Sequence, residues 1–82
     1  MPTIGRFGPY VIRFFSNEGS EPPHVHVDRG ACTAKIWLED PPRLALSRGF
    51  AAHEARIVLA LVAEHRGRCL NAWQTHFGGG DD

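Results

Sequence analysis

The sequence has little of several features that define whole classes of protein. It contains only two cysteines in 82 residues, and its nine basic side chains are balanced by nine acidic ones. Cys32 and Cys69 lie far apart and in no metal-binding spacing, so we expect reduced, mostly buried thiols rather than a disulfide. A net charge of zero argues against a surface that is basic throughout. Any patch that binds nucleic acid must therefore be local.

Long apolar runs are also missing. No stretch approaches the roughly 20 residues that span a bilayer, and the longest helix candidate is interrupted by charged residues at Glu54, Arg56 and Glu64. The sequence does not show the pattern of a signal peptide either. We therefore expect a soluble, cytoplasmic protein that makes no contact with a membrane.

The residues that are present suit one small globular domain. Apolar residues make up 43% of the chain and charged residues 22%, which lies in the ordinary globular range. We expect residues 1–77 to form a single α+β domain and residues 78–82, three glycines and two aspartates, to form a frayed tail. So short a chain buries only roughly 60 to 65% of its unfolded surface. Oligomerisation, for example as a homodimer, or a partner protein is therefore expected to add stability.

Short alternating segments predict a small antiparallel sheet of three to four strands. Residues 10–15 and 24–28 form a hairpin across a polar, glycine-containing connection, and residues 31–38 form a third strand with its small and aliphatic side chains inward. Residues 43–46, which follow a proline pair, form a short edge strand. Residues 1–9 contain two prolines and two glycines, which favours an extended arm with a turn.

Two helices are predicted after the strands, packed on one face of the sheet. Residues 50–66 show an apolar stripe that Ile57 and Leu61 widen to a second side, so this helix should touch the last segment or another chain as well as the sheet. Gly67 marks a break in the helical pattern. In residues 68–77 three apolar side chains recur at helical spacing and should pack together: Leu70, Trp73 and Phe77.

The run Pro22-Pro23-His24-Val25-His26 concentrates the chemistry of the chain. Its two histidines share one strand face with Asp28, at steps of about 6.5 to 7 Å. Three interpretations follow: a structural pair, an acid/base or substrate contact, or two ligands of a transition metal. A metal would need further ligands, for which the candidates are His53, His65, His76 and Asp40. None stands at a recognisable spacing, so we expect no metal and no cofactor.

Arginines near this run suggest phosphate chemistry. Arg6, Arg13 and Arg29 fall on or beside the same strands. Guanidinium groups next to paired imidazoles can hold and cleave a phosphodiester, with one imidazole taking a proton and the other giving one. The candidate catalytic residues for such a ribonuclease-like reaction are His24, His26, Arg13 and Arg6. The alternative is that the arginines are solvated or paired with nearby carboxylates.

Several segments together resemble a known bacterial family. The start Met1-Pro2-Thr3-Ile4, the strand Val11-Ile12-Arg13-Phe14-Phe15, the Pro-Pro-His-x-His run and Trp73 are similar to the DhiT-type toxins, first catalogued as a domain of unknown function. This resemblance implies the toxin half of a type II toxin–antitoxin pair that is silenced by a cognate antitoxin protein. It implies no particular reaction. The segment Val27-Asp28-Arg29-Gly30 departs from the family pattern.

These observations lead to one main hypothesis and two alternatives. The main hypothesis is a toxin-like protein whose strand face around His24 and His26 contacts RNA or the translation machinery and whose wide helix surface binds the antitoxin. The first alternative is a non-catalytic interaction module that regulates a small partner protein, with structural histidines. The second is a metal-binding module.

Overall fold

The computed structural model describes residues 3–15 and 19–78 of the chain. Within these residues a five-stranded antiparallel sheet with strand order β1-β2-β3-β4-β5 is followed by two helices. The strands are β1 (Thr3–Phe7), β2 (Tyr10–Arg13), β3 (His24–Arg29), β4 (Cys32–Trp37) and β5 (Arg43–Arg48), and the helices are α1 (Ala52–Glu64) and α2 (Arg66–Phe77). Every strand pairs with its neighbour in sequence, so the sheet is a simple meander.

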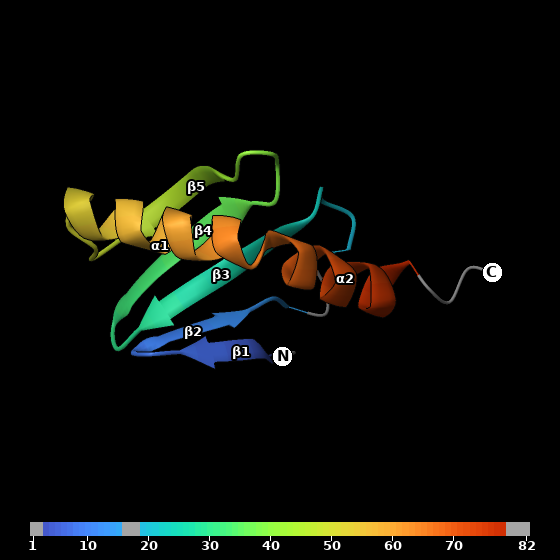
Figure 1. Ribbon diagram of the computed structural model, residues 1–82, viewed down its shortest axis with the longest axis horizontal. Coiled ribbons are helices and arrows are strands. Elements are labelled where there is room, and N and C mark those ends of the chain that lie inside the picture. The colour runs from blue at the N-terminus through green and yellow to red at the C-terminus, as the bar shows by residue number, and fades with distance from the viewer. Residues whose placement is uncertain (1–2, 16–18, 79–82) are drawn as a thin grey trace.

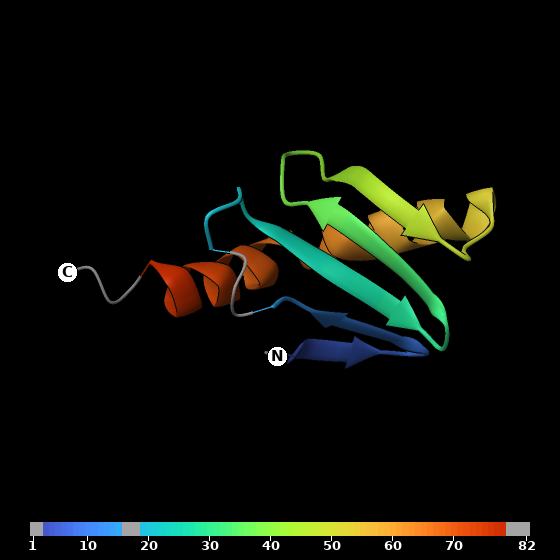
Figure 2. The same ribbon diagram turned by 180° about the vertical axis from the view of Figure 1, so that it is seen from behind.

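The layers are arranged as an α+β fold, as expected. Both helices lie over one face of the sheet (Figure 1), and the view from behind shows that the other face carries no helix (Figure 2). The predicted three to four strands are corrected to five. The additional strand is β1, which had been expected to be an extended arm. Gly8 adopts φ 60°, a left-handed conformation that suits glycine, and closes a tight turn that pairs Phe7 with Tyr10.

Strand register builds the core on the helix side of the sheet. Ile12 is opposite Val27, Val27 is opposite Ala34, and Val25 is opposite Ile36. Partners across antiparallel strands share a face, so these side chains form one continuous apolar surface. The helices complete the core with buried residues from both: Val58, Val62, Cys69 and Trp73. The predicted inward side of β4 is confirmed by Ala34, Ile36 and the following Leu38.

The break between the helices lies at His65, not at Gly67 as predicted. The His65 amide donates to the carbonyl oxygens of Leu61 and Val62, at 3.2 Å each, and its own carbonyl accepts the Cys69 amide at 2.9 Å. The His65 ring packs on Phe7 of β1, with ring centroids 4.2 Å apart. The break therefore coincides with a tertiary contact, and Gly67 lies in the first turn of α2.

The apolar side chains of the helices divide between the core and solvent. Trp73 and Phe77 pack together as predicted, with ring centroids 4.3 Å apart, and Leu70 lies partly buried against the core. Leu61 also packs against the core, whereas the Ile57 side chain is 52% exposed. Ile57 is thus the part of the wide stripe that meets no neighbour in the core.

Three further expectations from the sequence concern the two cysteines, the C-terminal tail and membrane-spanning segments. Cys32 and Cys69 are both free thiols, and burial raises the pKa of Cys69 to about 11, which keeps it protonated and unreactive. The predicted tail lies outside the described residues apart from Gly78. Of the two helices that the structure describes, neither has the length and apolar character needed to cross a membrane.

Candidate functional site

The sheet face that carries no helix is called the open face here, and the strand register identifies its residues. One row across the sheet contains Arg6, Val11, Asp28, Thr33 and Arg48. The next row contains Thr3, Arg13, His26, Lys35 and Leu46. A third, shorter row contains His24, Trp37 and Arg43. The first two rows alternate with the buried residues of the core and so point away from the helix layer, which lies on the other face of the sheet (Figure 2), whereas His24 in the third row is buried.

Charge is distributed unevenly over the molecule. Among the described residues, the open face carries five of the nine Lys and Arg side chains of the chain: Arg6, Arg13, Lys35, Arg43 and Arg48. The described strands contribute one carboxylate to the same face, Asp28. Carboxylates pair with three of these cations: Asp28 with Arg13, Glu21 with Lys35 and Glu39 with Arg43. The open face therefore carries a moderate excess of positive charge, which a polyanion would favour.

Arg13, His26 and Asp28 form the centre of the open face. Arg13 on β2 is directly opposite His26 on β3, and its Nε donates a hydrogen bond to the Asp28 carboxylate. Thr33 donates to the other carboxylate oxygen of Asp28 at 2.7 Å. Burial opposes ionisation of Asp28, but the hydrogen bonds from Arg13 and Thr33 outweigh it and lower its pKa. Asp28 is therefore an anion at neutral pH that holds the Arg13 guanidinium in place.

Two aromatic rings on or beside this face are each covered by a cation. The Arg13 guanidinium lies 4.5 Å from the ring centroid of Phe15, and the Lys35 ammonium lies 4.7 Å from that of Trp37. Lys35 is also paired with Glu21 at 2.8 Å. The His26 ring packs edge-on against Phe15, with centroids 4.8 Å apart. Cations and π surfaces thus lie side by side around His26, which is a common arrangement in sites for single-stranded nucleic acid.

His24 belongs to the same alternation but has no exposed surface. Its Nδ1 lies 2.9 Å from the Pro22 carbonyl oxygen, an acceptor, so Nδ1 carries the proton. Its ring contacts Trp37 on β4 and Trp73 on α2, with centroids 5.4 and 5.0 Å away. Strand alternation could predict the face of His24, but not that Trp73 would reach it from the helix layer. His24 therefore joins the sheet to α2.

The other candidate residues lie in different surroundings. Arg6 is exposed on β1, separated from β3 by one strand. Arg29 turns away from the open face and binds Glu54 of α1 through two hydrogen bonds, of 2.6 and 2.9 Å. Tyr10 donates a third hydrogen bond to Glu54 at 2.8 Å. These bonds lower the pKa of Glu54, with Arg29 as the larger cause, and the same contact raises the pKa of Tyr10. Arg29 thus anchors the start of α1 to the sheet.

The ligands that a metal site would need are not gathered together. In residues 3–15 and 19–78, no three His, Cys, Asp or Glu side chains are grouped so that they could hold a metal ion. Of the candidate ligands, His65 packs on Phe7, and His76 packs on Phe14 and Phe77. The histidine pair on β3 therefore acquires no third ligand from the described part of the chain.

A known protein family matches most of this chain. The family described as "Domain of unknown function (DUF4160)" matches residues 10–74. The chain belongs to the DUF4160 family. The matched segment of this DUF4160 protein runs from β2 to most of α2 and so contains all of the open face except β1. No curated protein and no solved structure matches the chain.

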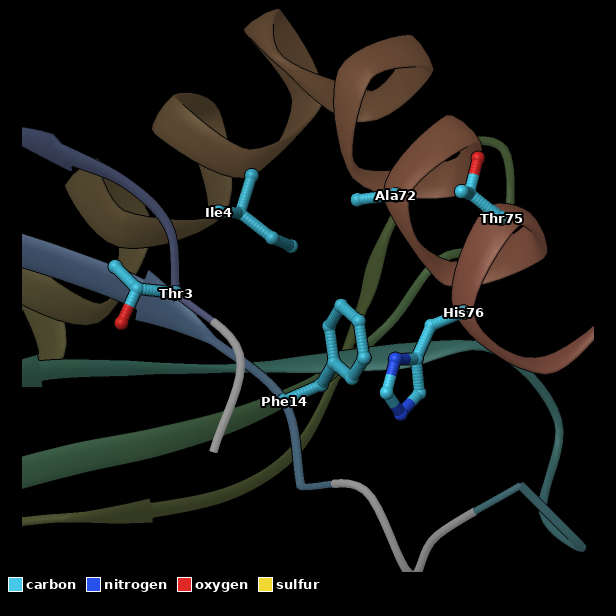
Figure 3. Close-up of a pocket in the computed structure, with 6 residues that line it drawn as sticks. All are labelled: Thr3, Ile4, Phe14, Ala72, Thr75 and His76. Atoms are coloured by element: carbon cyan, nitrogen blue, oxygen red, sulfur yellow. The ribbon is translucent and has the colours of Figure 1, made fainter.

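A cavity of about 430 Å³ lies between β1 and α2. Figure 3 shows Ile4 and Phe14 facing Ala72 and His76 across it, with Thr3 and Thr75 at its sides. Phe14 is buried at its base by ring contacts with Trp73, His76 and Phe77. The walls are mainly apolar and carry one titratable group, His76.

Proposed function

We propose that this DUF4160 protein is a toxin-like component of a type II toxin–antitoxin pair and that its open face contacts RNA. The observation that carries the RNA contact is the presence of five cationic side chains on one sheet face, of which three are paired with the carboxylates of Asp28, Glu21 and Glu39. Phosphate contacts supply most of the affinity in such complexes. The toxin assignment is supported by the resemblance of the Pro-Pro-His-x-His run and its neighbouring segments.

The chemistry of the open face supports binding more directly than cleavage. General acid–base cleavage requires two groups that reach the reacting atoms. Of the two predicted imidazoles, His26 is partly exposed, whereas His24 is fully buried. In this proposal Arg13 and His26 contact the phosphate backbone and His24 supports the position of His26, from which its ring centroid is 5.4 Å away. A ribonuclease-like reaction would assign proton transfer to His26 and charge stabilisation to Arg13.

The helix layer supplies a separate surface for the antitoxin. Ile57 lies on α1, which covers the sheet face opposite to the open face (Figure 1), and it is half exposed. A large apolar side chain in this position is suited to pack against a partner protein. An antitoxin bound here would leave the open face uncovered and would act by other means than direct blockage.

Growth after induced expression tests the toxin assignment. The wild-type protein should arrest growth, and the variant Arg48→Gln with His26→Ala should not, because it removes one cation and the exposed imidazole from the open face. Arg56→Gln removes a cation from the exposed side of α1 instead and should arrest growth like the wild type. An inert wild-type protein, produced in soluble form, would rule out the toxin function.

A non-catalytic interaction module is the second candidate, and the burial of His24 favours it. A histidine enclosed by two tryptophan rings has a structural role whether or not the protein is toxic. In this case the open face would bind a partner protein that it regulates. Growth would then be unaffected by expression, and the adjacent-gene product would copurify with the wild type but not with the open-face variant.

A further inference from the structure

We propose that Trp37 is a stacking position for an unpaired base of single-stranded RNA and that Lys35 covers this position in the free protein. The inference rests on the proposed RNA contact and makes it more specific, because it names the ligand class and the side chain that receives it. The sequence alone favours a core or interface position for Trp37 and allows stacking on a base only if Trp37 is exposed beside Lys35. Their importance follows from three structural relationships.

The first relationship is the position of Trp37 on the sheet. Trp37 is the last residue of β4, opposite His24 on β3 and Arg43 on β5. The buried His24 ring meets it edge-on, with an interplanar angle of 74°. The His24 ring also contacts Trp73 of α2, so buried aromatic contacts support the indole. Trp37 itself is partly exposed. A supported but accessible indole is pre-organised to accept a flat ligand.

The second relationship is the cover. The Lys35 ammonium occupies the position over the indole ring, 4.7 Å from its centroid, and is tethered there by the Glu21 carboxylate at 2.8 Å. Cation–π contacts and solvent-accessible ion pairs are individually weak, and lysine has a long flexible stem. A base can therefore replace the ammonium on the ring. The displaced ammonium remains within reach of the phosphate of that nucleotide.

The third relationship is the charge around the ring. Arg43 lies opposite Trp37 on β5, and its guanidinium is held by Glu39 through two hydrogen bonds of 3.0 and 2.9 Å. Arg48 and Arg13 extend the cationic surface along the neighbouring rows. Single-stranded RNA offers a planar base and a phosphate together, which matches a π surface among cations. A double helix keeps its bases stacked inside, where a flat sheet face does not reach them.

Tryptophan fluorescence allows a direct test with the intact protein and a short oligouridylate RNA. The chain has two tryptophans, and Trp73 is buried, so quenching by a stacked base reports on Trp37. We expect RNA to quench the emission of the wild type and of Trp73→Phe to a similar degree. Trp37→Ala should abolish the quenching and raise the Kd about tenfold, which corresponds to about 1.4 kcal/mol. Trp37→Phe should also abolish the quenching, but should raise the Kd only about threefold, because phenylalanine still stacks.

Two further variants separate stacking from charge. Glu21→Gln releases Lys35 from its tether and should lower the Kd about twofold to threefold, with the Trp37 quenching retained. Arg56→Gln removes a cation from the exposed side of α1, outside the open face, and should leave the Kd unchanged. Circular dichroism and the melting temperature confirm that each variant is folded. If Trp37→Ala does not fold, the comparison of Trp37→Phe with the wild type decides the matter.

Several outcomes would overturn the stacking proposal. RNA binding that leaves the Trp37 fluorescence of the wild type unquenched would refute it. It would also be refuted if Trp37→Phe bound RNA with the same Kd as the wild type and its fluorescence were still quenched. Equal affinity for the DNA oligonucleotide of the same sequence would refute the assignment to RNA, and equal affinity for polyglutamate would show a purely electrostatic surface. Absence of RNA binding would also refute the stacking proposal.

The growth assay is independent of the binding assay. Growth arrest without Trp37-dependent binding refutes stacking alone, and Trp37-dependent binding without growth arrest refutes the toxin function alone.

Discussion

Arg13 on β2 donates a hydrogen bond to Asp28 on β3, across the strand pair that carries His26. This contact fixes the direction of the guanidinium while its charge remains close to the surface of the sheet. Asp28 also accepts a hydrogen bond from Thr33 on β4, so one carboxylate connects three strands. A paired anion of this kind stabilises the fold and at the same time reduces the positive potential that a polyanion would meet.

Replacement of Asp28 should therefore separate stability from binding. Asp28→Asn removes a charge-assisted hydrogen bond from a partly buried group and should lower the free energy of unfolding by about 1 to 2 kcal/mol at neutral pH. The same change removes the strand carboxylate from the open face and should tighten RNA binding severalfold at low salt. Urea unfolding and a salt titration of the Kd measure the two effects. Glu64→Gln, on the exposed side of α1, is the control, and weaker RNA binding by Asp28→Asn would contradict the electrostatic argument.

The pH dependence of stability should follow Glu54. Its hydrogen bonds to Arg29 and Tyr10 lower its pKa in the folded protein below the ordinary value of 4.5. A lowered folded-state pKa means that the stabilising contribution is complete above about pH 4.5 and is lost as the pH falls through the folded pKa. Glu54→Gln should therefore be less stable than the wild type at pH 7, and the difference should shrink in acid. Melting curves between neutral and acidic pH measure this; a constant difference would show that Glu54 contributes by packing alone.

Tyr10 should act in the opposite pH range. Its hydrogen bond to Glu54 raises its pKa above the ordinary value of 10.0, so the contribution is complete below that pH and is lost as the pH rises through the folded pKa. Tyr10→Phe should remove this loss of stability in alkali and keep the acid transition that belongs to Glu54. Spectrophotometric titration of the single tyrosine provides the measurement. A phenol that titrates at its ordinary value would contradict the contact.

The two histidines of β3 should respond differently to substitution. His24→Ala removes a fully buried ring from between Trp37 and Trp73, and should lower the free energy of unfolding by about 2 to 4 kcal/mol. His26→Ala affects a partly exposed ring and should cost less than about 1 kcal/mol. Urea denaturation compares the two. Intact stability with lost biological activity in His24→Ala would instead restore the catalytic role predicted for this residue.

Ile57 should matter for partner binding and hardly at all for stability. Because its side chain is half exposed, Ile57→Ala should change the free energy of unfolding by less than about 0.5 kcal/mol. Ile36 is also an isoleucine but is fully buried, so Ile36→Ala should lower the free energy of unfolding by about 2 to 5 kcal/mol. Copurification with the protein encoded by the adjacent gene should be weakened by Ile57→Asp. Unchanged copurification would place the antitoxin on another surface.

Local patterns in the sequence determined most of the elements and the face on which each strand residue lies. Alternation placed His26, Asp28 and Lys35 on one side of the sheet and Ile36 on the other, because side-chain direction in a strand has a fixed period of two. The identity of β1 was not visible in this way, since Thr3–Phe7 contains a glycine and pairs only because the turn at Gly8 folds it back. A glycine-containing arm and an edge strand have nearly the same composition.

Tertiary structure decided how accessible each residue of the histidine run is and which side chains surround it. His24 and His26 are equivalent in the sequence pattern, yet Trp73, which is distant in the chain, packs against the His24 ring and contributes to its burial. Arg13 and Arg29 also differ in role, because Arg13 binds Asp28 on the adjacent strand and Arg29 binds Glu54 on α1. Such contacts depend on how helices pack against the sheet, and a periodicity within one segment carries no information about a neighbour from another.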